Sequence, residues 1–378
     1  MDHSATTPVD PQVVDAMLPY FSEKFGNSSS LHSFGQEAAE ALSMARQKVA
    51  DSIGAQADEI IFTSGGTESD NLGIRGILHE CTGQKAHIIT SVIEHPAVLN
   101  TCIYLESIGH EVTYVPVDDE GIIDLAELEG SIKENTSLIS VMHANNEIGT
   151  IQPIRGISKL AKDKGIYFHT DAVQSIGKIP VDVNDLGVDL LSVSSHKIHG
   201  PKGAGALYVR EGTELNALMF GGGQERNLRP GTENIPGIIG LGEAMYLAAQ
   251  RLDTDSKYMA GLRDSLIEKV FASIDDVRLN GHAVKRLPNN VNLSFRSVEG
   301  ESMLMMLDLK GIAVSTGSAC SSRSLKASRV LTSIGLSPDY IHGSLRISLG
   351  RENTMEEIDY MAACLQETIS RLREMSAL

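Results

Sequence analysis

Short apolar runs alternate with longer amphipathic segments between about residues 57 and 210 of the chain. The amphipathic segments repeat apolar residues at helical spacing, whereas the apolar runs are short and rich in Ile, Val and Phe, as strands are. These runs are EIIFTSG, AHIITSV, EVTYVPV, SLISVMH, IYFHTDA, DLLSVSS and GALYVR. Strands that helices cover on both faces are nearly continuous in apolar residues. The pattern therefore predicts an α/β domain with a mostly parallel seven-stranded sheet.

The segments on either side of this region indicate a second, smaller domain. After it, a long helical stretch from about 238 to 272 leads to the runs NNVNLSF, GESMLMMLDLKG, IAVSTGS and LRISLG and to a final helix near 354 to 374. We expect a large α/β domain of residues 14–250 and a small α+β domain made of residues 1–13 and 251–378. One face of a helix before the strand region is marked by Ala38, Leu42, Ala45, Val49 and Ile53.

Composition and charge exclude several classes of protein. The 378 residues carry a net charge of −17, so a nucleic-acid backbone or an anionic membrane surface would be repelled. The opening MDHSATTPVD has no apolar signal-peptide core, and no apolar run is long enough to span a membrane. The four cysteines are far apart, with no pairing or metal-binding spacing. We expect a cytoplasmic protein without a metal, a membrane contact or a nucleic-acid partner.

Polar residues at the ends of the predicted strands are the candidates for chemistry, because open α/β sheets bind ligands at the carboxyl ends of their strands. The first strand runs into GGTESDN, where Gly65, Gly66 and Thr67 open a helix. Free N–H groups at such a helix start form a phosphate cradle, although Thr67 is equally suited to be a simple helix cap. Neither a P-loop nor a strand-linked GxGxxG motif accompanies it.

Three further strands end in polar groups, each with an ordinary structural alternative. His95 of EHPAV follows a strand, where a helix cap or a core histidine is also common. The adjacent Asn145 and Asn146 fit a turn equally well. Asp171 ends the apolar strand YFHTD, and Gln174 follows three residues later. A carboxylate in that position needs a cationic or hydrogen-bonding partner.

The segment SSHKIHGPKG is harder to explain as structure alone. Ser194, His196 and Lys197 follow a strand and precede a Gly- and Pro-rich loop. A lysine among cationic and desolvating neighbours is a candidate Schiff-base amine, because its neutral form is favoured there. A phosphate cradle, a strand-end aspartate and this lysine together are what pyridoxal phosphate requires. The spacing of His196 and His199 does not indicate a metal site, since no acidic residue is nearby.

One thiol, Cys320, lies in STGSACSSRS, among small and polar residues that can neither pack a core nor hold a regular helix. A cysteine in a Gly- and Ser-rich loop next to an arginine is exposed and can be stabilised as a thiolate, whereas a structural cysteine usually lies among apolar residues. The segment by itself fits a chemical role and a structural role for Cys320 equally well. The contexts of Cys81, Cys102 and Cys364 are helical and partly apolar, and we interpret them as structural.

The whole chain resembles the fold-type I pyridoxal-phosphate enzymes and, within them, the cysteine desulfurases of the iron–sulfur cluster type. The resemblance rests on the collinear stretches DHSATTP, FGNSSSLHSFG, FTSGGTESDN, EHPAV, HANNEIGTIQPI, HTDAVQSIGKI, SSHKIHGPKGAGALYVR, GGGQERNLRPGTEN, LPNNVNLSF, STGSACSS and LRISLGR. It implies a pyridoxal-phosphate-dependent homodimer that converts L-cysteine to L-alanine. The sulfur would remain as a persulfide on Cys320 and pass to an iron–sulfur scaffold or another acceptor protein.

The resemblance also implies a role for each matching residue. Lys197 would bond the cofactor, His95 would stack on its ring, Asp171 would pair with the ring nitrogen, and Arg346 would bind the substrate carboxylate. Gln174 and Asn146 would contact the ring hydroxyl or the substrate. The phosphate would be held by Gly66, Thr67, Ser194, His196 and, from a second subunit, Thr232.

Two departures and two alternatives remain at this point. The family usually has DNAATT and GNPSS where this chain has DHSATT and GNSSS, which affects His3, Ser4 and Ser28 near the expected substrate entrance. A selenocysteine lyase or another carbon–sulfur lyase would use the same cofactor pocket. A non-catalytic sulfur-binding scaffold fits less well, because it needs neither Lys197 nor Cys320. The "STGSACSS" stretch resembles the branch of the family with a long loop around the cysteine.

Overall fold

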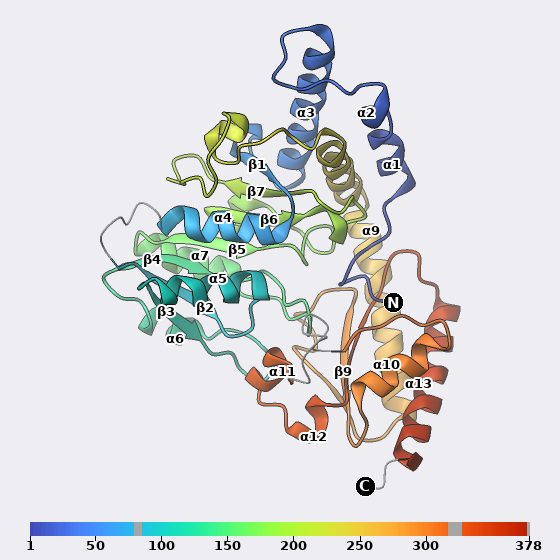
Figure 1. Cartoon of the computed structure of the whole chain (residues 1–378). Coiled ribbons are helices and arrows are strands. Elements are labelled where there is room, and N and C mark those ends of the chain that lie inside the picture. The colour runs from blue at the N-terminus through green and yellow to red at the C-terminus, as the bar shows by residue number, and fades with distance from the viewer. Residues whose placement is uncertain (79–84, 317–326, 376–378) are drawn as a thin grey trace.

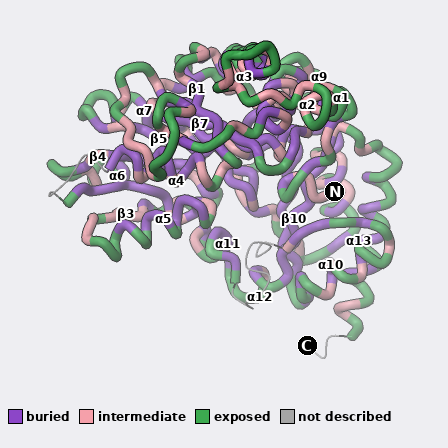
Figure 2. Tube along the Cα trace, turned by 45° about the horizontal axis from the view of Figure 1, so that its top comes forward, coloured by how far each residue is buried: buried purple, intermediate pink, exposed green. Residues whose placement is uncertain are grey.

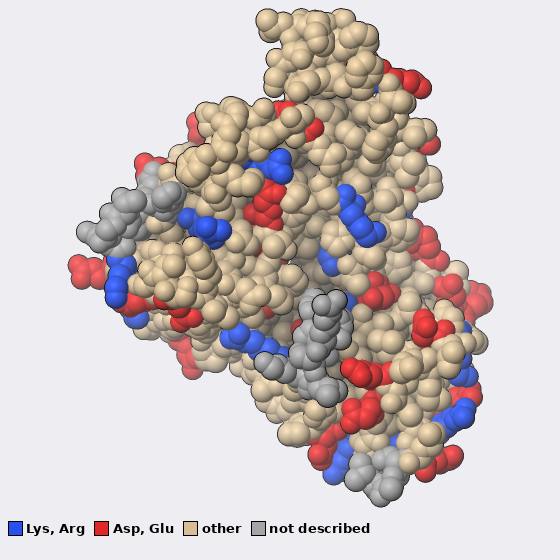
Figure 3. All heavy atoms as spheres, viewed as in Figure 1, with Lys and Arg blue, Asp and Glu red and all other residues tan. Residues whose placement is uncertain are grey.

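The computed structural model describes residues 1–78, 85–316 and 327–375. The predictions for Cys81 and Cys320 therefore lie outside the described residues. A large unit contains a seven-stranded sheet and a smaller unit contains a three-stranded sheet, and the chain's N-terminus lies between them (Figure 1). No helix among the described residues is long and apolar enough to cross a lipid bilayer. On the face shown in Figure 3, acidic and basic side chains are interspersed, with acidic groups prominent over the smaller unit.

The large sheet contains all of the predicted strands, in the order β1-β7-β6-β5-β4-β2-β3. Strands β2 to β6 pair in parallel, and β7 is antiparallel to both of its neighbours, β1 and β6. The mostly parallel sheet predicted from the sequence is thus confirmed. The strands are β1 Ile60–Thr63, β2 His87–Ser91, β3 Glu111–Val115, β4 Thr136–Ser140, β5 Tyr167–Asp171, β6 Leu190–Ser194 and β7 Gly205–Val209.

Helices cover both faces of this sheet, which explains why its strands read as continuous apolar runs. Successive strand residues enter different cores, since side chains alternate between the faces of a strand. Ile61 and Ile88 pack against α4 (Gly66–Leu78) and α5 (Pro96–Ser107). Ile60 and Ile89, one position away, belong to the opposite core. Figure 2 shows the buried sheet between exposed outer surfaces. The helices that contribute to this second core include α3 Ser33–Ser52, α7 Ile154–Asp163, α8 Val183–Leu186 and the first part of α9 Ile235–Ser273.

The smaller unit is an antiparallel sheet covered by helices on its apolar face. Its strands are β8 Val277–Leu279, β9 Asn290–Phe295 and β10 Ser344–Ser348, with β9 in the middle. The core between this sheet and its helices contains Leu266, Phe295, Met303, Leu345 and Leu365. The other helices of the chain are α1 Pro11–Met17, α2 Pro19–Ser22, α6 Leu125–Gly130, α10 Gly300–Asp308, α11 Arg329–Ser333, α12 Pro338–Ile341 and α13 Met355–Met375, with short 3₁₀ turns at Ala57–Glu59, Ser195–Lys197 and Gln224–Asn227.

The helix α9 joins the two units as one continuous element of 39 residues. Its buried residues up to Leu247 pack in the core of the large unit, and those from Leu262 onward pack in the core of the smaller unit. The predicted domain boundary at residues 250 and 251 falls between these two sets, inside the helix. The division into 14–250 and the remainder stays a prediction, because the chain has no break or linker at that point.

The free edge of strand β1 is covered by an ion pair between the half-buried Arg46 and the buried Glu225. The two guanidinium ends of Arg46 donate to the two carboxylate oxygens of Glu225 at 2.9 and 2.6 Å. Glu225 also accepts from the backbone N–H of Phe62, and Arg46 also donates to the carbonyl of Ile60. These side chains therefore satisfy backbone groups that an edge strand would otherwise expose to pairing with another chain. The pair also fixes a turn in which Glu225, Arg226 and Asn227 have positive φ.

We expect Arg46→Met to reduce stability strongly, because it leaves the Glu225 carboxylate buried without its counter-ion. Removal of one partner of a buried pair costs about 3–5 kcal/mol. Urea unfolding of the purified protein measures this loss. Adding Glu225→Gln to Arg46→Met should restore part of the lost stability, since the stranded charge is then gone. A double variant less stable than Arg46→Met would contradict this explanation.

Candidate active site

A cavity of about 300 Å³ lies beyond the carboxyl ends of the parallel strands. It brings together residues that follow or end five strands (β1, β2, β4, β5 and β6), the N-terminal segment and β10. Most of the residues predicted from the sequence line it, and Thr232 and the undescribed Cys320 are not among them. The lining consists of Ser4, Ala5, Gly66, Thr67, Asp70, His95, Met142, Asn146, Asp171, Val173, Gln174, Ser194, His196, Lys197 and Arg346.

One end of the cavity is suited to an anion. The helix α4 begins at Gly66, so its first N–H groups have no helical acceptor and carry the positive end of the helix dipole. A Cβ at Gly66 would come within 2.8 Å of Val173 Cγ2, so the close approach there requires glycine. Burial and neighbouring lysines lower the pKa of His196 to about 4, which leaves its ring neutral. Ser194, at the end of β6, also lines the cavity.

Lys197 lies in the 3₁₀ turn that follows β6, and its amine is directed at the N-terminal segment. Its Nζ donates to the carbonyl oxygen of Ser4 and, at 2.8 Å, to that of Ala5. The Ser4 carbonyl also accepts from Gln174 Nε2 at 3.0 Å. The first residues of the chain therefore form one wall of the cavity, which explains why the motif DHSATTP matches the family so early in the sequence.

The carboxylate of Asp171 is buried at the end of β5 and accepts from the backbone N–H of Val173 at 2.9 Å. Burial raises its pKa, while His95 and Lys197 act in the opposite direction. A second carboxylate, Asp70 of α4, is also buried, and desolvation together with the charge of Asp171 raises its pKa well above the usual value. Asp70 Oδ1 has no hydrogen-bond partner among the described residues. A cationic group placed between these carboxylates would relieve this repulsion.

His95 has a defined tautomer. It is the N-cap of α5, and its Nδ1 accepts from the backbone N–H of Ala97 at 3.1 Å. Burial lowers the pKa of the imidazole, so the ring is neutral and carries its proton on Nε2. The sequence left open whether His95 was a cap or a functional residue. It is a cap in this structure, and it lines the cavity as well.

The two adjacent asparagines occupy different environments. Asn145 is fully buried, where its amide donates to the Ile93 carbonyl and its oxygen accepts from the backbone of Glu147 and Ile148. Asn146 lines the cavity, so the choice between them made from the sequence agrees with their positions. Gln174 Oε1 is buried without a partner among the described residues, which leaves an acceptor for a bound group.

Arg346 enters the cavity from the opposite side, on β10 of the smaller unit. Its guanidinium is buried, and Nη1 donates to the backbone carbonyl of Asn146 at 3.1 Å. Nη2 forms an ion pair with Asp2 at 3.1 Å. A buried guanidinium facing a cavity is suited to a planar carboxylate.

The described residues fit pyridoxal phosphate on several independent features. A helix N-terminus with an obligatory glycine faces the region suited to a phosphate, and the Lys197 amine lies in the same cavity. Two buried carboxylates, Asp70 and Asp171, would be stabilised in their ionised forms by a positive charge such as a protonated ring nitrogen. The unpartnered oxygen of Gln174 provides an acceptor for a ring hydroxyl. The described residues contain no cluster of side chains that could hold a metal ion.

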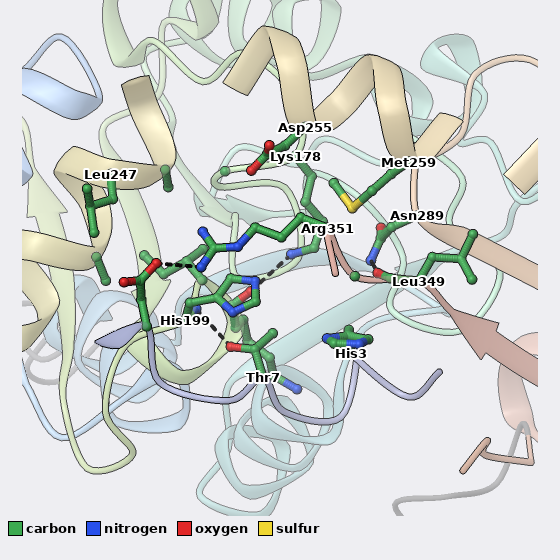
Figure 4. A pocket seen from close by; sticks show the side chains of 17 residues that line it. His3, Thr7, Lys178, His199, Leu247, Asp255, Met259, Asn289, Leu349 and Arg351 are labelled. Carbon is green, nitrogen blue, oxygen red and sulfur yellow. Dashed lines mark hydrogen bonds and ion pairs between the residues drawn. The ribbon is translucent and has the colours of Figure 1, made fainter. Parts of the chain in front are cut away.

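A second, smaller cavity of about 40 Å³ includes Lys197 in its lining, and Figure 4 shows Lys178, His199 and Arg351 around it. It contains Lys178, which is buried and donates to the Lys197 carbonyl at 3.3 Å. Burial and the charge of Lys197 lower the pKa of Lys178 to about 7. The His3 ring also borders this cavity, whereas Ser4 borders the first one. Ser28 lines neither and donates to Glu233 at 2.8 Å.

The sequence did not reveal the buried charges around the site. Asp70 and Lys178 are buried and Glu147 is half-buried, and desolvation raises the pKa of Glu147 to about 7. Glu147 accepts a hydrogen bond from Ser328 Oγ at 2.6 Å. Lys178 and Glu147 lie in stretches already matched to the family, SIGKI and NNEIG, so their position in those motifs was the available signal. Their chemistry depends on burial, which a local pattern does not report.

Comparisons with known proteins agree with this geometry. Residues 1–361 match the sequence profile of the aminotransferase class-V family. The chain is 53% identical to the cysteine desulfurase IscS of Dictyoglomus turgidum, over 100% of this chain and 95% of the relative. It is 50% identical to a human cysteine desulfurase, over 100% of this chain and 83% of the relative.

Solved structures give the same result. A NifS-like protein superimposes with a TM-score of 0.92 at 41% identity, covering 98% of each chain. A structure described as SspA in complex with cysteine has a TM-score of 0.83 at 40% identity, covering 93% of this chain and 99% of that one. The predicted fold-type I architecture is thus confirmed. The chain belongs to the aminotransferase class-V family and, within it, to the pyridoxal-phosphate-dependent cysteine desulfurases.

Proposed function

We propose that this enzyme converts L-cysteine to L-alanine and leaves the sulfur as a persulfide on Cys320, from which an acceptor protein for iron–sulfur cluster assembly receives it. The observation that carries the proposal is the single cavity shared by Lys197, Asp171, His95 and Arg346. It combines an amine, a buried carboxylate, a neutral imidazole and a guanidinium. Relatives about half identical to the chain over its full length are cysteine desulfurases.

The cofactor would be held by the groups already described. Pyridoxal phosphate, when bound, supplies an aldehyde that captures an amine and a ring that withdraws electrons. Gly66, Thr67, Ser194 and His196 would bind its phosphate, and Lys197 would bond its aldehyde. Asp171 would keep the ring nitrogen protonated, supported by the second carboxylate nearby. Asn146 and Gln174 would contact the ring hydroxyl or the substrate, and His95 would stack on the ring with its Nε2 proton available for transfer.

Lys178 supports the assignment of Lys197 as the reactive amine. The Lys178 amine donates to the Lys197 carbonyl at 3.3 Å, and the charge of Lys197 adds to burial in lowering the pKa of Lys178 to about 7. A neutral amine is the nucleophilic form, so a cationic neighbour in a desolvated site favours attack on an aldehyde.

The substrate would be fixed at both ends. Its carboxylate would bind the Arg346 guanidinium, while its amino group would reach the aldehyde. The Cys320 sulfur would then attack the substrate sulfur, forming the S–S bond as the carbon–sulfur bond breaks. The electron pair of the broken bond stays with the β-carbon, which takes up a proton to give alanine. Thiol and cysteine thus yield persulfide and alanine, with no outside oxidant or reductant.

The other described cysteines are poorly suited to this step. Burial raises the pKa of Cys102 to about 12, and nearby glutamates add to the effect, so no thiolate forms near neutral pH. Cys364 is buried in the core of the smaller unit. The segment around Cys320 lies outside the described residues. Cys320 is therefore supported as the sulfur acceptor only indirectly, because Cys102 and Cys364 are buried and unsuited to this role.

We further propose that the enzyme is a cytoplasmic homodimer. Large apolar side chains are exposed in the loop between α2 and α3 and in the loop after β7, including Leu31 at 92% and Phe220 at 89%. Apolar exposure of this size marks a contact surface more often than a surface facing water. Thr232 is exposed on the loop before α9 and lies outside its own chain's cavity, which supports a contact with the cofactor site of a second subunit.

We expect Cys320→Ser to abolish sulfur transfer while the cofactor site remains intact. A serine hydroxyl is not ionised near neutral pH, so alanine formation should fall more than about a hundredfold. The variant should stay yellow and should still change its absorbance on addition of L-cysteine. Mass spectrometry of the wild type after one turnover should find the added sulfur on the Cys320 peptide. Cys364→Ala, a matched loss of a buried thiol, should retain turnover. Alanine release at the wild-type rate by Cys320→Ser would favour a carbon–sulfur lyase instead.

We expect Lys178 to give the enzyme a stability that rises with pH. Its folded pKa is about 7, below the ordinary value of 10.5, so the unfolded chain binds more protons between these values. The wild type should therefore gain about 2 kcal/mol of stability relative to Lys178→Met between pH 7 and pH 9. Unfolding of both proteins, saturated with cofactor, measures this difference. Lys164→Met, at an exposed lysine, is the control, and parallel pH profiles for Lys178→Met and wild type would contradict the assignment.

A mixed dimer tests the contribution of Thr232 across the interface. One subunit would carry Lys197→Ala and its partner Thr232→Val. If each site combines Lys197 of one chain with Thr232 of the other, one site of this dimer has both defects and the second has none. Such dimers should bind one cofactor with wild-type affinity and retain about half of the activity. Two defective sites per mixed dimer would show that Thr232 acts within its own chain.

A further inference from the structure

Arg346, the expected receptor of the substrate carboxylate, already has a carboxylate partner. Nη2 of Arg346 pairs with Asp2 Oδ1 at 3.1 Å, although the two residues are 344 positions apart. The Arg346 side chain is 4% exposed and that of Asp2 is 24% exposed. A pair this well shielded from water is stronger than an ordinary surface ion pair. Asp2 itself is not part of the lining of the cavity.

Asp2 is held firmly in this position. The backbone of Asp2 forms an isolated parallel β-bridge with Ser348 of β10. The backbone N–H of His3 donates to the Ser348 carbonyl at 3.2 Å. The second carboxylate oxygen of Asp2 accepts from Ser315 Oγ at 2.9 Å. Ser315 in turn forms an antiparallel bridge with Arg346. Asp2, Ser315 and Arg346 thus constitute a closed set of contacts around one guanidinium.

The hydrogen bonds of Arg346 leave a particular group available. Nη1 donates to the Asn146 carbonyl and Nη2 to Asp2, whereas Nε is buried and has no acceptor among the described residues. A carboxylate binds best to two parallel N–H groups on one edge of a guanidinium. One edge of the guanidinium consists of Nε–H and one of the two N–H groups of Nη2. Asp2 needs only one N–H group of Nη2, so this edge is left for a ligand. Without Asp2, the side chain would lose the partner that fixes which edge faces the cavity.

We propose that Asp2 is a positioning residue that presents the Nε edge of Arg346 to the substrate carboxylate and, through its negative charge, limits how tightly any carboxylate ligand is held. This inference rests on the proposed function, in which Arg346 binds that carboxylate. Asp2 acts through Arg346 and does not itself touch the reacting atoms.

The limit on affinity follows from the reaction. The substrate L-cysteine and the product L-alanine carry the same carboxylate, so added affinity for it would retain the product as much as the substrate. Such uniform binding does not accelerate the chemical step. A resident carboxylate on the same guanidinium weakens both ligands through repulsion and still preserves the orientation. Asp2 would therefore allow Arg346 to orient the ligand carboxylate without binding it as tightly as an arginine with no counter-ion would.

Two substitutions at Asp2 distinguish its charge from its position. Asp2→Asn keeps an oxygen that accepts from Arg346 but removes the negative charge, so L-alanine should bind about three- to tenfold more tightly. Asp2→Ala also removes the acceptor, so it should bind L-alanine more weakly than Asp2→Asn. The affinities come from absorbance titrations of the cofactor-loaded enzyme with L-alanine. L-alaninamide, which has no carboxylate, should bind all three proteins equally.

A third variant tests the position of Asp2 without changing either charge. Ser315→Ala removes the hydroxyl that fixes the second oxygen of Asp2. The affinity for L-alanine should therefore fall by a few-fold, and the affinity for L-alaninamide should not change. Asp15→Asn, which removes a carboxylate from an exposed site on α1, is the matched control and should change neither ligand. Bound cofactor, measured by absorbance in every variant, confirms that each has folded.

The outcomes separate this proposal from the function on which it rests. If Arg346→Lys leaves the affinity for L-alanine unchanged, the carboxylate assignment of Arg346 is wrong and both proposals lose their basis. If Arg346→Lys weakens L-alanine but Asp2→Asn binds it no more tightly than the wild type, the role of Asp2 alone is overturned. Equal affinities in Asp2→Asn and Asp2→Ala overturn its positioning role. A matching change for L-alaninamide would show a general effect on the fold instead.

Discussion

The parallel arrangement of β2, β4, β5 and β6 is the constraint on which the active site depends. These strands are neighbours in one sheet and point the same way, so their carboxyl ends reach a common edge. His95, Asp171 and Lys197 all lie at or just beyond those ends. None of these residues needs a special local conformation to meet the others. The remaining requirement is a partner for this edge, which β10 of the smaller unit and the N-terminal segment provide.

Exclusion of water gives these groups their chemistry. Burial lowers the pKa of His196 to about 4, and it raises the pKa values of Asp70 and Asp171 above their usual range. The cavity therefore contains a base that resists protonation and acids that resist ionisation. A cofactor with a phosphate and a protonated ring restores the charges that these groups lack. The same desolvation that disfavours isolated charges in this cavity thus favours a ligand that supplies the compensating charges.

The sequence predicted what depends on local pattern and missed what depends on distant contacts. The strands of the large sheet and the long helix α9 were predicted from the spacing of apolar residues, which is a property of the local sequence alone. The strand β8 was missed because its three residues are too few to show alternation. The local pattern pointed to Lys197 and the family resemblance pointed to Arg346, but neither indicated Asp2 as the counter-ion of Arg346. Such a pair joins opposite ends of the chain, so no window of sequence contains both partners.

The continuous helix α9 has a mechanical consequence. At 1.5 Å per residue, its 39 residues extend for about 58 Å, through the cores of both units. Any rotation of the smaller unit against the sheet must flex this rod, and elastic deformation stores energy that grows with the angle. The helix therefore favours one angle between the two units and resists displacement from it, unlike a flexible hinge. Thermal agitation would produce small oscillations of Arg346 about one resting distance from Lys197, instead of wide opening and closing.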